Sequence, residues 1–144
     1  MFLHLIRRTW FSLRPPKPSH EQLREVEVIL SEKESALWHR MARADQSHSL
    51  MVLKRFDHET PGAPNAARAG VLLHDIGKIW SDLNTLERVA ATLVGPRGER
   101  FRRYHDHEEL GKIALVEADS DPITVETACG EGIWGQQLRW ADRI

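Results

Sequence analysis

The chain has 144 residues, of which 28% are charged and 41% are hydrophobic, a composition typical of a soluble globular protein. This length predicts one domain with enough chain to bury a core. The formal net charge of −1 gives no support to nucleic-acid binding, and the lone cysteine, Cys129, has no partner for an intrachain disulfide. We therefore expect no nucleic-acid partner and a reducing, cytoplasmic setting.

Residues 1–18 differ in character from the rest of the chain. The first 20 residues include four Arg or Lys side chains and no acidic one, and apolar residues recur among them at helical spacing. We expect a basic amphipathic helix over residues 1–14 that packs on the domain, with contact to an anionic membrane surface as the less favoured alternative. A stiff proline-rich linker completes this segment, and the folded domain is expected over residues 19–144.

Helix-start signals divide the domain into short helices. Ser19 with Gln22 and Ser31 with Glu34 form capping boxes, which predict one helix to about residue 30 and a second over residues 32–56. The remaining predicted helices are one capped by Asn65 that ends near Gly77, and others over about 81–94, 99–117, 122–130 and 134–142. No strand alternation or internal repeat interrupts them, so we expect an all-α fold, a compact bundle of about six to seven helices.

The central stretch is an apolar run, Gly70 to Leu73, that leads directly into the pair His74–Asp75. Imidazole nitrogen and carboxylate oxygen atoms are both good ligands for divalent transition metals. The apolar residues before the pair indicate a buried environment, in which a carboxylate needs a cation or a strong hydrogen-bond donor. Taken alone, the pair fits either a metal site or a capping Asp beside a core His.

Two further residues complete a recognisable pattern with this pair. His48 lies on the inward stripe of the predicted 32–56 helix, and Asp142 follows the core residue Leu138 by four positions. With them, the chain over about residues 40–144 resembles the HD-domain metal-dependent phosphohydrolase superfamily, whose members contain a His, a His-Asp pair and a distant Asp in this order. The resemblance implies an HD-like helical fold and a metal held by these four side chains.

The predicted ligands are His48, His74, Asp75 and Asp142. Two imidazoles and two carboxylates suit manganese, iron, cobalt, nickel or zinc better than magnesium, which prefers oxygen ligands. In relatives with two metals, a His like His107 binds the second ion together with a further His near position 129. This chain has Cys129 there, so we expect one divalent transition metal ion.

Three residues are candidates for catalysis. The resemblance implies that Asp75 accepts a proton while it binds the metal. Lys78 is predicted to hold a phosphate oxygen, with a solvated surface lysine as the equal alternative. His107 is predicted to protonate the leaving group or bind a substrate phosphate, with a hydrogen-bonded core histidine as the alternative.

The expected function is hydrolysis of a nucleotide or another small phosphate ester by a metal-activated water. Two alternatives come from other functional classes. One is a di-iron oxygenase of the kind that some relatives form on the same scaffold, and the other is a non-catalytic metal-binding HD module. The expected partner is a small phosphorylated substrate.

Overall fold

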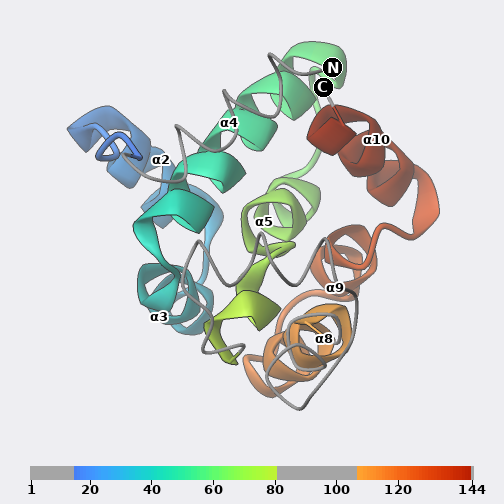
Figure 1. The fold of residues 1–144 in the computed structure, drawn as a ribbon. Coiled ribbons are helices and arrows are strands. Elements are labelled where there is room, and N and C mark those ends of the chain that lie inside the picture. The colour runs from blue at the N-terminus through green and yellow to red at the C-terminus, as the bar shows by residue number, and fades with distance from the viewer. Residues whose placement is uncertain (1–14, 81–106, 144) are drawn as a thin grey trace, which may run out of the picture.

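The computed structural model describes residues 15–80 and 107–143 (Figure 1). The helices predicted over 1–14 and 81–94 lie outside these ranges, as does the first part of the one predicted over 99–117. The described ranges contain helices and no strand, which confirms the all-α prediction. In chain order the elements are α2 (His20–Ile29), α3 (Glu32–Arg40), α4 (Arg43–Glu59), α5 (Asn65–Leu73), the 3-10 helix η1 (Ile76–Trp80), α8 (His107–Glu117), α9 (Pro122–Ala128) and α10 (Gly132–Arg143).

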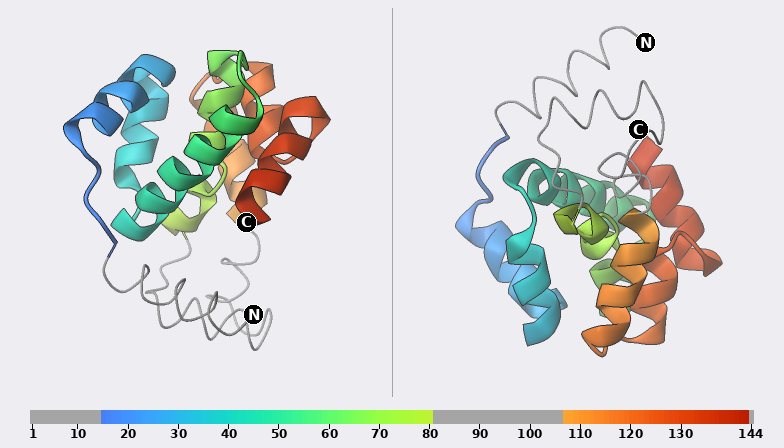
Figure 2. Two further views of the ribbon diagram at one scale, coloured as in Figure 1. Left: turned by 90° about the horizontal axis from the view of Figure 1, so that it is seen from above. Right: turned by 60° about the horizontal axis from the view of Figure 1, so that its bottom comes forward.

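Helix α5 occupies the centre of the bundle. Helices α2 and α3 lie on one side of it, α9 and α10 lie on the other, and α4 runs alongside it (Figures 1 and 2). Its buried residues are distributed around nearly the whole helix, as expected for a helix enclosed by neighbours. They are Ala67, Ala69, Gly70, Val71, Leu72 and Leu73.

No helix in the described ranges combines the length and the apolar character that crossing a membrane would require.

The predicted helix starts are largely confirmed. Both capping boxes form, because Ser19 and Ser31 each exchange hydrogen bonds with the residue three positions later. The Asp121 side chain caps α9 by accepting a hydrogen bond from the Ile123 backbone amide at 2.8 Å. The prediction that Asn65 caps α5 is wrong by one residue, because Pro64 is the N-cap residue and Asn65 is the first residue of the helix.

The prediction of one helix over residues 32–56 is wrong, because the helix is interrupted at Met41, between α3 and α4. Met41 is extended and buried. The Gln46 side chain donates to the Trp38 carbonyl oxygen at 3.1 Å, and this oxygen also accepts a hydrogen bond from the Met41 backbone amide at 3.1 Å. The Trp38 indole donates to Ser49 Oγ at 3.0 Å across the break. These contacts between α3 and α4 stabilise the turn.

Two glycines allow neighbouring helices to approach each other closely. A Cβ atom on Gly70 of α5 would lie 2.6 Å from Thr127 Cβ of α9, so only glycine fits that contact. A Cβ atom on Gly111 of α8 would lie 3.3 Å from the backbone nitrogen of Gly77 in η1. The 3-10 helix that follows the His74–Asp75 pair therefore packs directly against α8.

Candidate metal centre

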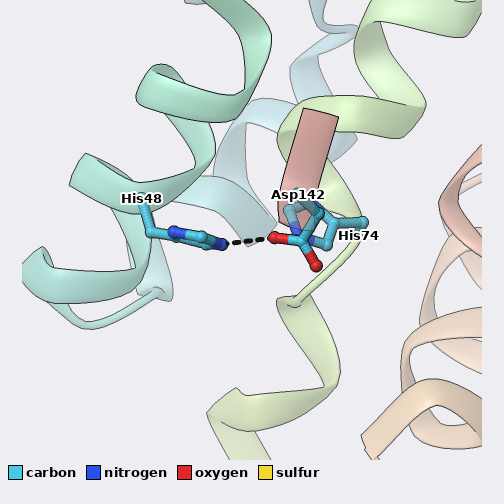
Figure 3. Close-up of side chains that lie close together, drawn as sticks. All are labelled: His48, His74 and Asp142. Atoms are coloured by element: carbon cyan, nitrogen blue, oxygen red, sulfur yellow. Dashed lines mark hydrogen bonds and ion pairs between the residues drawn. The ribbon is translucent and has the colours of Figure 1, made fainter. Parts of the chain in front are cut away.

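The structure brings three of the predicted ligands together from three helices. His48 projects from α4, His74 is the C-cap residue of α5, and Asp142 lies in the last turn of α10 (Figure 3). The expectation that the His74–Asp75 pair lies within a helix is wrong. Helix α5 ends at Leu73, so the pair occupies the turn that leads into η1.

The ligand atoms of His48, His74 and Asp142 all lie within 4.8 Å of one another. His48 Nε2 and Asp142 Oδ1 are 2.7 Å apart, a hydrogen-bond distance between residues 94 positions apart in the chain. His74 Nε2 lies 3.6 Å from the same oxygen. The two imidazole rings are 5.8 Å apart between centroids and tilted by 56°, and each presents its Nε2 to the same Asp142 oxygen.

The two ring nitrogens of His74 have different environments. Nδ1 lies 2.6 Å from the Val71 carbonyl oxygen, which can only accept a hydrogen bond, so Nδ1 carries a proton and donates it. Nε2 is buried and makes no hydrogen bond to any described residue. A metal-binding histidine characteristically donates one ring N–H to a carbonyl and keeps the other nitrogen for the ion. His74 has this arrangement.

Asp75 and Lys78 lie beside the cluster of three candidate ligands. Asp75 Oδ2 is 3.5 Å from His74 Nε2 and 3.0 Å from Lys78 Nζ, and both Asp75 and Lys78 side chains are largely buried. Asp75 does not belong to the group whose ligand atoms are all within 4.8 Å, so the predicted fourth ligand adjoins the cluster. Lys78 makes an ion pair with Asp75, and its side chain is 17% exposed, unlike that of a solvated surface lysine.

The charges of the cluster favour ionised carboxylates. Burial alone would lower the pKa of His74, but the negative charges of Asp75 and Asp142 outweigh it and raise that pKa to about 9. Burial opposes ionisation of Asp75, yet the positive charges of His74 and Lys78 hold its pKa well below the usual range. Burial also disfavours ionised Asp142, but its hydrogen bond with His48 and the nearby His74 hold its pKa low.

These residues fit a transition metal ion on their own chemistry. Two imidazoles and one carboxylate supply mixed nitrogen and oxygen donors, with the second carboxylate of Asp75 adjoining them. The buried His74 Nε2 lacks the hydrogen bond that a buried polar atom normally makes, and coordination of an ion would satisfy it. Two carboxylates with depressed pKa values add the negative charge that attracts a cation.

The remaining predicted site residue, His107, is the first residue of α8, and its side chain lies outside the described part of the structure. Sequence reasoning missed the part played by the Val71 carbonyl, since a backbone acceptor leaves no residue-type signal. It also missed the ion pair of Asp75 with Lys78, although their three-residue spacing was a usable signal.

Comparison of this chain with models of protein families, with curated proteins and with solved structures finds no match. The resemblance to the HD-domain superfamily therefore rests on the residues of the chain itself.

Proposed function

We propose that this chain is a metal-dependent phosphohydrolase of the HD-domain superfamily that acts on a nucleotide or another small phosphate ester. The observation that carries this proposal is the convergence of His48, His74 and Asp142, which come from distant parts of the chain, around an unsatisfied imidazole nitrogen. The family pattern names the same three residues as ligands. The lone cysteine, Cys129, supports a cytoplasmic setting for this activity.

The proposed cofactor is one divalent transition metal ion, either manganese, iron, cobalt, nickel or zinc. His48, His74 and Asp142 would hold it, with Asp75 as the adjoining fourth ligand. When bound, such an ion lowers the pKa of a coordinated water and polarises a phosphoryl oxygen. The mixed nitrogen and oxygen donors support these metals over magnesium.

Residues beside the ligands have proposed roles in proton and charge transfer. Asp75 Oδ2 lies 3.5 Å from His74 Nε2, and the family resemblance implies that this carboxylate accepts a proton next to the cluster. Lys78 offsets the charge of Asp75 and provides a positive group for a substrate phosphate. His107 is the proposed donor of a proton to the leaving group.

The test combines metal loading with a substrate panel. Protein loaded with manganese, cobalt or zinc is assayed for phosphate release from nucleotides and sugar phosphates, and His74→Ala is compared with His58→Ala. His58 is a matched control because it lies on the same bundle but is exposed. We expect release by the unmodified protein and by His58→Ala, and none by His74→Ala.

Two results would contradict the proposal in different ways. Binding of one metal ion without hydrolysis of any substrate on the panel would favour a non-catalytic metal-binding module. Binding of two iron ions with oxygen consumption would favour the di-iron oxygenase.

A further inference from the structure

A side chain outside the ligand set connects the two helices that carry His48 and Asp142. The guanidinium group of Arg55 on α4 donates a hydrogen bond from Nη1 to the Ala141 carbonyl oxygen on α10, at 3.2 Å. Ala141 is fully buried and directly precedes Asp142. Arg55 thus contacts the backbone at the position from which the Asp142 side chain projects.

The Ala141 carbonyl lies in the last described turn of α10, which spans Gly132–Arg143. Carbonyl groups near the C-terminal end of an α-helix are commonly met by donors from outside the helix. A cation near this end also interacts favourably with the helix dipole. Terminal turns fray when nothing holds them, so the contact with Arg55 restrains the turn that positions Asp142.

The position of Arg55 on α4 suits the restraint of the last turn of α10. Arg55 follows His48 by seven residues, nearly two helical turns, so both side chains lie on the face of α4 that meets α10. Met51 lies between them, and its sulfur accepts a hydrogen bond from Arg55 Nη2 at 3.7 Å. One face of α4 therefore supplies both a candidate ligand and the group that fixes the helix end carrying another.

We propose that Arg55 is a positioning residue for the metal centre. It holds the last turn of α10 against α4, so that Asp142 Oδ1 stays within reach of His48 Nε2 and His74 Nε2. This inference rests on the proposed metal site, and Arg55 itself is not a ligand. Its loss is expected to weaken metal binding through Asp142 while the imidazole ligands remain in place.

The experiment measures cobalt affinity by titration for the unmodified protein, Arg55→Ala, Arg55→Lys and Arg139→Ala. Arg139 is a matched control, because it lies on α10 and its Nε donates to the backbone carbonyl oxygen of Gly130, just before the first residue of the helix, at 2.7 Å. Arg55→Ala should bind cobalt about tenfold more weakly, as for other residues that orient metal ligands. Arg139→Ala should stay within about twofold.

The conservative variant and a double-mutant cycle separate positioning from general destabilisation. Arg55→Lys keeps a charge and a donor, so it should fold and recover part of the affinity. In an Asp142→Asn background, Arg55→Ala should cause little further loss, since the side chain that it positions no longer contributes its charge.

The outcomes distinguish this inference from the proposed function. Failure of the unmodified protein to bind cobalt would overturn the metal site and this inference with it. Cobalt binding that is equally tight in Arg55→Ala, or equally weakened by that change with and without Asp142→Asn, would overturn the assignment of Arg55 alone.

Discussion

Two carboxylate oxygens lie near the buried Nε2 nitrogen of His74. Asp75 Oδ2 lies 3.5 Å from Nε2 and Asp142 Oδ1 lies 3.6 Å from it, both beyond good hydrogen-bond distance. The other ring nitrogen is committed to the Val71 carbonyl. The imidazole is thus fixed in orientation, and a metal ion that binds Nε2 would displace the proton that the raised pKa of His74 keeps there.

Lys78 should matter to stability as well as to catalysis. Lys78→Ala removes a largely buried cation 3.0 Å from Asp75, so the buried carboxylate loses part of its compensation. We expect the free energy of unfolding to fall by about 1–3 kcal/mol in urea titrations without metal. Lys33→Ala is the control, because the Lys33–Asp119 pair has a similar distance of 2.8 Å but is exposed. Equal stability of Lys78→Ala and the unmodified protein would contradict this view of the pair.

His107 is expected to act on the leaving group. His107→Ala should lower kcat by roughly 10²–10⁴-fold on a phosphate ester with a poor leaving group, the usual range for lost general acid–base help. An activated aryl phosphate needs no proton on its leaving group and should be affected much less. Equal slowing of both substrates together with loss of metal would instead make His107 a ligand and favour a two-metal centre.

The residues of the site were more predictable than their contacts. His48, His74 and Asp142 were selected by residue type and order, and the structure brings them together. The Asp75–Lys78 ion pair was not predicted, although side chains three residues apart are neighbours on a helix. The end of α5 at Leu73, which places the His74–Asp75 pair in a turn, was not predicted either.

Among the elements, α5 and α9 approach each other closely at Gly70. Gly70 faces Thr127, and the Thr124 hydroxyl donates to the Ala66 carbonyl oxygen at 2.7 Å. Small side chains on both helices allow this approach. The end of α5, and with it His74, is therefore held by the packing of α9.

Gly70→Ala should push these helices apart. The added Cβ would meet Thr127 Cβ at 2.6 Å and the Thr124 carbonyl oxygen at 2.8 Å, and the backbone atom cannot move aside easily. We expect a loss of about 1–3 kcal/mol in the free energy of unfolding, despite the better helix propensity of alanine. Gly111→Ala meets its neighbour at 3.3 Å and should cost less. Chemical denaturation of both variants measures the order, and the reverse order would contradict the packing described.

Helix starts could be predicted because their signals are local. The capping boxes at Ser19 and Ser31 lie within four residues of sequence. The break at Met41 could not be predicted in this way, since neither proline nor glycine marks it. It is stabilised by contacts such as Trp38 with Ser49, which depend on how two helices pack.

For the whole molecule, helix α5 links the elements on both sides of the bundle. Arg68 on α5 makes ion pairs at 2.7 Å with Glu25 of α2 and with Asp57 of α4. The opposite side of the bundle packs on α5 through α9. Because the candidate ligands lie on α4, at the end of α5 and on α10, a metal ion bound among them would connect three helices of one fold.

A bound metal should therefore stabilise the entire fold. A ligand that binds the native state alone adds about 2.7 kcal/mol at a free concentration of 100 times its Kd. We expect cobalt to raise the Tm of the unmodified protein and of His58→Ala, and to leave that of His74→Ala unchanged. A similar rise in Tm for His74→Ala would place the stabilising ion elsewhere.

The most direct test of the metal centre is anomalous X-ray diffraction from crystals of the cobalt-loaded protein. We predict one anomalous peak per chain, about 2.0–2.2 Å from His48 Nε2, from His74 Nε2 and from an Asp142 carboxylate oxygen. No peak among these three side chains, or a peak bound only by other residues, would contradict the account.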